Sequence, residues 1–304
     1  MAVNLLYIVS LWCVFLIIML NNQIISKPIF VSWVLLILIS FYLHQKQVSA
    51  QEVEDESEFD YVDGSEKGPQ HWGDLKEEWR ACKHGKLQSP IDLLNLRVKV
   101  LPKFGKLQMN YKPANATIRN RGHDIAVVWA GDAGSAKING INYLLKQCHW
   151  HSPSEHSFNG RRFDLELHMV HESHEVNGES KIAVTALFYK IGKPDRFLTK
   201  LTKHVTSIAD TKEEVHQGVV DPRELRLGGF KYYRYIGSLT VPPCTQGVLW
   251  AINKRISTVS RVQVRLLRVA VHDFAERNAR PLQPLNERDI HLCGPMFQPE
   301  DLKH

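Results

Sequence analysis

Apolar and polar residues alternate from Phe163 to Met169 in one stretch near the middle of the chain, residues 163–171, which read Phe-Asp-Leu-Glu-Leu-His-Met-Val-His. A period of two is that of a β-strand with one buried face, and it puts His168 on the face opposite the apolar side chains. An earlier run, residues 143–151, is strand-like in its aromatic and apolar content and stops at Ser152-Pro-Ser154. We expect the two runs to pair as a hairpin across the Asn159-Gly160 turn region.

Short strands dominate the rest of the pattern, and helices are few. Alternating segments between residues 93 and 128 are broken by proline and glycine, and residues 182–189 form an apolar run typical of a buried strand. Apolar residues recur at helical spacing from Pro194 to Ile208, with Pro194 suited to the first turn. A possible capping box, Ser260 to Gln263, opens a second helix. The pattern predicts a mainly β single domain with a few short peripheral helices.

The N-terminus carries two apolar runs, Leu5 to Leu20 and Ile29 to Leu43, each shorter than a membrane-spanning helix of ~20 residues. The second run has Lys27 before it and the small residues Val48-Ser-Ala50 after it, which is the layout of a secretory signal peptide. We predict cleavage after Ala50. An uncleaved anchor is the alternative, and Met19 is an alternative start.

The segment that follows is acidic and poor in apolar residues, so we expect a solvated arm there. The predicted boundaries are 1–50 for the signal peptide or anchor, 51–66 for the acidic linker, 67–294 for the folded domain and 295–304 for a tail.

The composition agrees with a single globular domain. The chain has 304 residues, of which 44% are apolar and 23% charged, and these are values of a globular protein. Its formal charge of +6 comes from scattered lysines and arginines, with no basic stripe interleaved with aromatic residues, so we expect no nucleic-acid partner.

Three histidines form the candidate chemistry. Side chains alternate along a strand, so His149 and His151 point the same way, and the proposed hairpin adds His168. With 15 histidines in the chain, one His-x-His could be chance, but a third histidine on a neighbouring strand favours a metal site. Three neutral nitrogen ligands with a fourth position open describe a catalytic zinc, Zn2+. Gln147 and Glu166, each two residues before a ligand, would hold the rings as an outer shell.

Several motifs then match one family in its own order. They are Gln88-Ser-Pro-Ile-Asp92, Asn120-Arg-Gly-His123, Ser154-Glu-His-Ser-Phe-Asn-Gly160, Glu166-Leu-His-Met-Val-His171, Gly237-Ser-Leu-Thr-Val-Pro-Pro-Cys244 and Asn278-Ala-Arg-Pro-Leu-Gln-Pro-Leu285. From about His71 to about Leu285 the chain resembles the α-class carbonic anhydrases, and most of all the plant members. The resemblance implies a large twisted, mostly antiparallel central sheet with the metal at the bottom of a cone.

The resemblance also implies the reaction, which is the reversible hydration of carbon dioxide to bicarbonate and a proton by zinc-bound hydroxide. Thr240 would accept the proton of that hydroxide in a hydrogen bond and donate its own to Glu155. His123 matches the family's proton shuttle, which we expect at the cavity mouth, and an imidazole pKa near ~6.5 suits that transfer. Asn278 would join Gln147 in the outer shell.

The remaining site assignments follow from the same resemblance. The substrate pocket would be lined by Val170, Val184, Leu239, Thr240, Val241 and Trp250. Two positions depart from the family: Val241 stands where many members have a second threonine, and Asp74 where animal members often have a tyrosine of the proton relay. Both departures concern rate and inhibitor affinity rather than the reaction.

The cysteines bear on the compartment. The family's secreted members join the two positions that match Cys82 and Cys244, which points to an oxidising environment. Strand alternation turns Cys148 away from the metal, so we predict that it is a small core residue. We assign no role to Cys293. Asn115-Ala-Thr117 is a glycosylation acceptor if the chain is exported. The expected location is the secretory pathway, ending in the apoplast or, as in some plant relatives, the chloroplast stroma.

Two other functions remain open at this stage. A weakly catalytic binding or storage protein could use the same fold, since fold does not fix function, but such members typically lack one of the three histidines. A metal-dependent esterase could use the same hydroxide. We expect a monomer or dimer, with membrane contact only if the N-terminal segment stays attached.

Overall fold

The computed structural model describes residues 58–94, 97–101, 107–174, 180–211, 213–227, 231–271 and 275–294. The two N-terminal apolar runs and the predicted cleavage site lie outside these residues. Within them, no helix has both the length and the apolar character needed to cross a bilayer.

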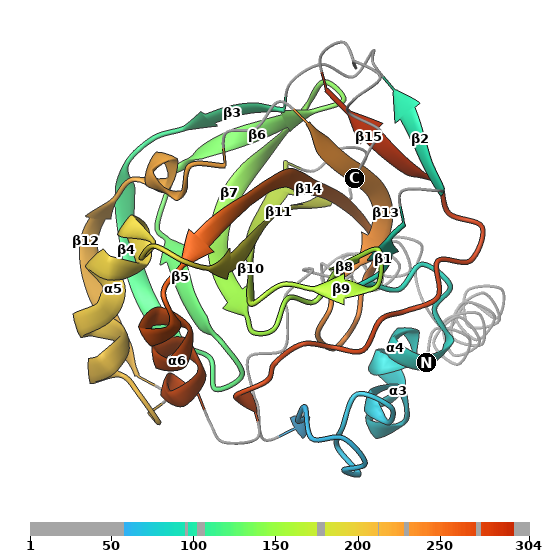
Figure 1. Cartoon of the computed structure of the whole chain (residues 1–304), viewed down its shortest axis with the longest axis horizontal. Coiled ribbons are helices and arrows are strands. Elements are labelled where there is room, and N and C mark those ends of the chain that lie inside the picture. Colours follow the sequence, from blue (N-terminus) through green and yellow to red (C-terminus); the bar gives the residue numbers. More distant parts are fainter. Residues whose placement is uncertain are drawn as a thin grey trace, which may run out of the picture. The chain divides into compact units, whose positions relative to one another are not determined.

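Twelve strands form one large sheet. They are β2 (Val98–Leu101), β3 (Gln108–Tyr111), β4 (Ala114–Asn120), β5 (Ile125–Trp129), β6 (Gly134–Ile138), β7 (Ile141–His151), β10 (Leu165–Ser173), β11 (Ile182–Ile191), β12 (Glu214–Val220), β13 (Tyr232–Ser238), β14 (Gln246–Val259) and β15 (Ile290–Cys293). The main path runs β12-β4-β5-β7-β10-β11-β14-β13-β15-β2, and β6 pairs with both β3 and β7. Only β11–β14 and β15–β2 are parallel among its described pairs, so the prediction of a mainly β, mostly antiparallel sheet is confirmed (Figure 1).

A second, three-stranded sheet combines two strands of the connection between β7 and β10 with one earlier strand. It contains β1 (Asp92–Leu93), β8 (Ser157–Phe158) and β9 (Arg161–Arg162). The β8–β9 turn is formed by Asn159 and Gly160 with φ of 49° and 77°. Two left-handed residues make the tight hairpin turn whose twist matches that of the strands, and Asn-Gly is the sequence that best tolerates it. This turn returns the chain so that β10 pairs with β7.

The helices are short and peripheral, as predicted. They are α3 (Trp72–Leu75), η2 (Glu77–Trp79), α4 (Ala81–His84), α5 (Arg196–Ser207), η5 (Pro222–Leu225) and α6 (Arg261–Ala270). The Asp195 side chain caps α5 by accepting from the Leu198 N–H, so Pro194 precedes the cap and does not lie in the first turn. Before α6, Ser260 and Gln263 form the predicted capping box.

The main core lies between the sheet and the helices α5 and α6. Buried side chains from both sides of this layer include Trp150, Leu167, Phe197, Leu201 and Leu267. Cys148 belongs to the same cluster, and burial raises the pKa of its thiol well above the ordinary value. This core position agrees with the strand alternation, because the opposite face of β7 carries His149 and His151.

A smaller core gathers aromatic side chains beside α3 and α4. Phe59 is 1% exposed and packs edge-on against Trp72 and Trp79. The Trp72 indole N–H also donates to the carbonyls of Asp60 and Lys67. The expectation of a solvated acidic arm is therefore wrong for the part that begins near Phe59, because its aromatic residues anchor it to the domain.

Cys82 of α4 is bonded to Cys244, as the resemblance implied, with a sequence separation of 162. In the chain-entropy description, closing a loop of that length stabilises the folded state by roughly 5 kcal/mol. The bond ties the aromatic cluster to the segment that carries Thr240 and Val241.

Candidate metal centre

The three candidate ligands come together through strand register. β7 and β10 are antiparallel, and His149 is directly opposite His168. His151 lies two residues after His149 and so shares its face. One ring nitrogen from each of the three buried residues falls in a group whose atoms all lie within 4.8 Å of one another.

Hydrogen bonds on the far side of two rings decide which nitrogen is free. His149 Nδ1 is 2.9 Å from Gln147 Oε1, and His151 Nδ1 is 2.7 Å from the backbone oxygen of Asn278. An amide oxygen can only accept, so both Nδ1 atoms carry the hydrogen. The Nε2 lone pairs of His149 and His151 are therefore left for a metal.

Glu166 holds the third ring in the opposite tautomer. Its Oε1 atom is 2.9 Å from His168 Nε2 and 2.7 Å from His156 Nδ1. A carboxylate accepts, so His168 donates from Nε2 and keeps its Nδ1 lone pair free. His156 in turn lies 2.7 Å from the Tyr235 hydroxyl, which continues this buried chain of hydrogen bonds. His156, Glu166 and His168 also satisfy a metal-ligand spacing, but their polar atoms already bond one another.

Burial favours the neutral form of the histidine rings, which is the form that binds a metal. Burial lowers the pKa of His149 well below its usual value, although Asp124 opposes the shift. Burial likewise lowers the pKa of His168, against the nearby Glu166. Burial by itself raises the pKa of the Glu166 carboxyl, but His156 and His168 outweigh it and the net pKa is lowered. Neutral imidazoles held by ionised or carbonyl acceptors are the ligands that zinc prefers, so these residues fit the metal.

Glu155 lies against the open side of the cluster. It is fully buried, and its Oε2 atom is 3.6 Å from His151 Nε2 and 3.9 Å from His168 Nδ1. Oε1 accepts from the backbone N–H of Arg280 at 3.0 Å, whereas Oε2 has no hydrogen-bond partner among the described residues. Thr240 is also buried, but in the part of the chain that the structure describes no hydrogen bond joins it to Glu155. The free Oε2 can accept one.

An apolar wall borders the ligands in the next row of the sheet. Val170 of β10 is opposite Val184 of β11, and Val184 is opposite Trp250 of β14. This row lies two residues from His168 along β10, so its side chains share the metal-binding face. The Trp250 ring centroid lies 4.8 Å from that of His168, and the Trp250 indole N–H donates to Ser238 O. Leu239 and Val241 are also buried, at 1% and 2% exposure.

His123 is enclosed and does not lie at an open cavity mouth as expected. It is 1% exposed, and its ring centroid is 5.3 Å from that of Phe59. Its backbone oxygen accepts from Asn278 Nδ2, so one residue contacts both His123 and the candidate ligand His151. Phe59 covers the ring because the described segment that begins at residue 58 packs against Trp72 and Trp79.

Asp74 lies elsewhere. It is on α3, nearly half exposed, and its carboxylate pairs with Lys83 at 2.6 Å, which lowers its pKa. An exposed carboxylate paired with a lysine does not replace the relay tyrosine that the resemblance placed at this position in animal members. On the side of His123, Tyr61 instead packs edge-on against Phe59 and Trp72.

Three sets of residues that support this site were not predicted from the sequence. Phe59 lies in a segment read as solvated, although an aromatic pair in an acidic stretch was a signal for packing. His156 and Tyr235 support Glu166, and only the adjacency of His156 to Glu155 hinted at a role. Arg280 is 1% exposed and donates to Gln88, Ser89 and Cys82 while its backbone holds Glu155. No local pattern marks such an arginine.

Comparison with known proteins agrees with this geometry. The profile of the eukaryotic-type carbonic anhydrases matches residues 67–293. The chain is 53% identical to alpha carbonic anhydrase 7 of Arabidopsis thaliana over 81% of this chain and 88% of the relative. It is equally identical, at 53%, to carbonic anhydrase Nec1 of Nesocodon mauritianus over 84% and 93%. Its fold resembles a dioscorin complexed with ascorbate, with a TM-score of 0.76, 45% identity and coverage of 79% and 100%. It also resembles the α-carbonic anhydrase of Thermovibrio ammonificans with sulfanilamide, with a TM-score of 0.68, 35% identity and coverage of 77% and 98%.

Proposed function

The chain belongs to the eukaryotic-type carbonic anhydrase family, and from that premise we propose that it hydrates carbon dioxide reversibly at a zinc ion held by His149, His151 and His168. The observation that carries the proposal is the tautomer pattern, in which an outer acceptor on each ring leaves one buried nitrogen free. A histidine cluster that served only packing would not need three such acceptors. When bound, zinc lowers the pKa of a water to roughly 7 and so supplies hydroxide at neutral pH.

Glu155 and Thr240 would orient the nucleophile. Glu155 Oε2 is buried beside the cluster and can accept the Thr240 hydroxyl proton. The threonine oxygen can then only accept a hydrogen bond, so it selects the proton of the nucleophile and leaves a lone pair for the attack. The Arg280 backbone N–H keeps the carboxylate in place.

Val170, Val184 and Trp250, with Leu239 and Val241, would form the substrate wall. Carbon dioxide is small and apolar, and these buried side chains offer it a mainly hydrocarbon surface. Trp250 has its indole N–H turned to Ser238, so only its apolar ring remains for this role.

His123 is the proposed proton carrier, and its replacement by alanine should lower the hydration rate in dilute buffer by about 100-fold, the lower end of the range of general acid–base effects. The carbon dioxide step itself should be nearly unchanged. Added imidazole should restore much of the loss, measured by stopped-flow with a pH indicator at several buffer concentrations. Because Phe59 covers the ring, the transfer requires a side-chain movement there. Equal rates for variant and parent in dilute buffer would assign the proton transfer to another group.

The proposed function is tested on the purified protein by metal analysis together with two rate assays, carbon dioxide hydration and ester hydrolysis. One zinc per chain, and hydration that is lost with a chelator and regained with zinc, is the expected result. A zinc-loaded protein that hydrolyses esters but leaves hydration at background would favour the hydrolase. Full activity without bound metal would contradict the proposal.

A binding protein on the same fold is the second candidate, and the dioscorin structure with ascorbate favours it, because that relative holds an organic molecule. The present chain has all three histidines within one group. A protein that carries one zinc per chain but hydrates carbon dioxide only at the background rate would support the binding function instead.

Export is proposed as well, on the signal-like N-terminus and on Asn115. This residue is exposed on β4 and is the asparagine of an Asn-Ala-Thr acceptor motif for N-glycosylation. We expect the accumulated protein to begin near Gln51 and to lose mass on removal of N-linked glycans, both read by mass spectrometry. An intact Met1 would support the anchor, and an unmodified Asn115 would argue against the secretory route.

A further inference from the structure

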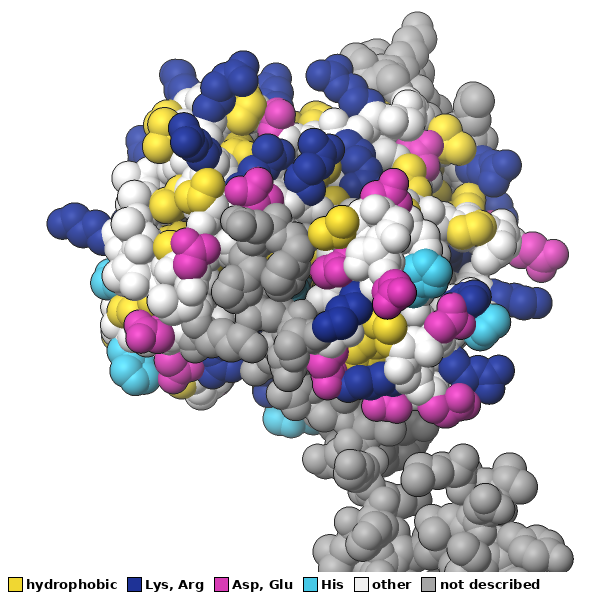
Figure 2. Space-filling model, turned by 90° about the horizontal axis from the view of Figure 1, so that it is seen from below, with side chains coloured by type: hydrophobic (Ala, Val, Ile, Leu, Met, Phe, Trp, Pro, Cys, Tyr) yellow, Lys and Arg dark blue, Asp and Glu magenta, His cyan; other side chains and the backbone are white. Residues whose placement is uncertain are grey.

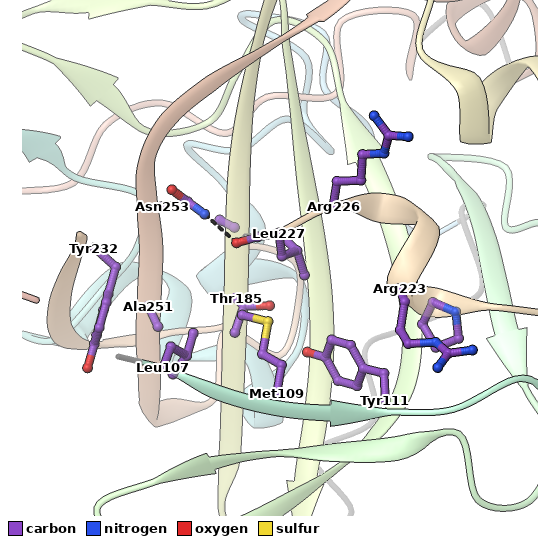
Figure 3. A pocket seen from close by; sticks show the side chains of 12 residues that line it. Leu107, Met109, Tyr111, Thr185, Arg223, Arg226, Leu227, Tyr232, Ala251 and Asn253 are labelled. Carbon is purple, nitrogen blue, oxygen red and sulfur yellow. Dashed lines mark hydrogen bonds between the residues drawn. The ribbon is translucent and has the colours of Figure 1, made fainter. Parts of the chain in front are cut away.

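A cavity of about 370 Å³ lies on the opposite side of the sheet from the histidine cluster (Figure 3). Thr185 of β11 lines it, and alternation turns Thr185 away from its neighbour Val184 on the metal-binding face. Strands β3, β13 and β14 and the turn that follows η5 supply the other walls. Its volume falls within the range of small-molecule pockets.

Hydroxyl groups mark one part of the cavity wall. Thr185 is 1% exposed, and its Oγ1 atom forms no hydrogen bond of normal length and angle among the described residues, although it lies close enough to the Tyr111 hydroxyl to offset part of the rise that burial gives the Tyr111 pKa. Figure 3 shows the Tyr111 hydroxyl directed toward Met109 and Thr185. A buried hydroxyl without a partner costs about 1–3 kcal/mol, so a ligand that bonds Thr185 would recover this loss.

The hydrogen on Tyr111 is already used. His171 Nδ1 lies 3.2 Å from the carbonyl oxygen of Ala183 and therefore donates, which leaves Nε2 as an acceptor. Burial lowers the pKa of His171 to about 4, so the ring is neutral at physiological pH. Tyr111 donates to this Nε2 at 2.8 Å, and its oxygen faces the cavity as an acceptor. A ligand hydroxyl satisfies both groups, because it can donate to Tyr111 and bond Thr185.

Apolar side chains form the middle of the cavity. Leu107, Met109, Leu227, Ala251 and the ring of Tyr232 line it. Asn253 adds little polarity, because its Nδ2 donates to Leu227 O and its Oδ1 accepts from Arg255 N. A flat apolar body such as one aromatic ring matches this lining.

Positive charge stands at the rim. Figure 3 shows Arg223 and Arg226 on the side of the cavity away from Tyr232. Asp221 neutralises Arg223 through bonds of 2.9 Å to Nε and 2.7 Å to Nη2. Arg226 forms no ion pair with any residue that the structure describes, and the nearby Glu224 is taken by Lys200 at 2.6 Å. Burial raises the pKa of Asp195, and the Arg226 charge opposes part of this rise. Figure 3 shows the Arg226 guanidinium directed away from Met109 and Thr185, so it can meet an anion only at the outer rim of the cavity.

Both signs of charge occur on the face of the molecule drawn in Figure 2, with lysine and arginine side chains predominating in the upper part of the view and acidic ones more frequent below. General attraction to anions is therefore a poor explanation for binding at one place, and specificity has to come from the cavity itself. We propose that this cavity binds a single-ring aromatic carboxylate that carries a hydroxyl group, with the hydroxyl at Tyr111 and Thr185, the ring against Met109 and Leu227, and the carboxylate at Arg226.

The test uses 4-hydroxybenzoate as the probe and calorimetric titration of the zinc-loaded protein in excess sulfanilamide, the compound bound in the Thermovibrio relative. We expect one site per chain that sulfanilamide does not block. Benzoate, which lacks the hydroxyl, and 4-hydroxybenzamide, which lacks the charge, should each bind about tenfold more weakly, the effect of one lost polar interaction. The proposal does not depend on the proposed function, since binding is read directly.

Variants locate the site. Arg226 has a left-handed φ of 48°, which asparagine tolerates well, so Arg226→Asn removes the charge without new backbone strain. It should weaken 4-hydroxybenzoate about tenfold and leave 4-hydroxybenzamide unchanged. Ala251→Leu should fill the cavity and abolish binding of both. Arg265→Gln, an exposed charge change on α6, is the control that should change neither.

Thr185→Val preserves shape, so it keeps the test open if the larger leucine prevents folding. It should weaken 4-hydroxybenzoate and leave benzoate unchanged. Displacement of 4-hydroxybenzoate by sulfanilamide would show that the probe binds at the metal site and not in this cavity. Insensitivity to Arg226→Asn and Thr185→Val, or no saturable binding in the millimolar range, would overturn the proposal.

Discussion

Replacing His168 by alanine should abolish zinc retention and carbon dioxide hydration together. Loss of an outer hydrogen-bond partner alone costs about 10–100-fold in metal affinity, so loss of a ligand should cost at least ~100-fold. Hydration should fall to background, because two ring nitrogens do not complete the site. Zinc content after dialysis and stopped-flow hydration rates measure the two effects on the same sample.

The substitution also leaves Glu166 with one donor fewer, although His156 still bonds it. A fall of about 1–3 kcal/mol in the free energy of unfolding is expected from that loss, so thermal unfolding should accompany the assay. His174→Ala is the matched control, because His174 is exposed just beyond the end of β10 and should leave zinc and rate unchanged. Full zinc occupancy in folded His168→Ala would contradict the three-histidine site.

Replacing Glu155 by glutamine should keep the metal and remove most of the activity. The backbone N–H of Arg280 donates to Oε1, so the amide oxygen should take this place and the NH2 group should replace Oε2. An NH2 group donates and cannot accept the Thr240 proton. We expect hydration to fall by about 10²–10³-fold, the usual scale for losing a positioned proton acceptor.

Zinc content separates this result from a damaged site, since none of the three ligands is changed. Glu172→Gln on β10 is the control: its carboxylate is partly exposed, 3.7 Å from Lys146, and its loss should change neither zinc nor rate. A normal hydration rate in Glu155→Gln would remove Glu155 from the mechanism, whereas loss of zinc would make it a support of the ligands.

The fold class and the grouping of the three histidines were predictable because both depend on local periods. A strand turns successive side chains to opposite faces, so His149 and His151 share a face wherever the strand lies. The Asn159-Gly160 turn then sets the connection, and the register places His168 opposite His149. The capping box at Ser260 is equally local, with its partner three residues away.

Other parts were predicted wrongly or not at all because they join distant segments. Whether a histidine is exposed depends on what covers it, and Phe59, 64 positions before His123 by residue number, covers this one. The rear cavity escaped prediction for the same reason, since Tyr111, Thr185 and Arg226 show no common pattern along the chain.

The sequence by itself determined the sheet-forming period, the two longer helices with the capping box of the second, the set of three histidines and the resemblance to a family. Only the tertiary structure decided which nitrogen of each ring is free, because the acceptor for His151 is the Asn278 backbone, 127 residues away. It also decided that Glu155 is held by Arg280, that Asp74 is outside the site and that a cavity lies behind β11. Local patterns follow from the geometry of one strand or one turn, whereas burial and hydrogen-bond partners follow from how the whole chain closes on itself.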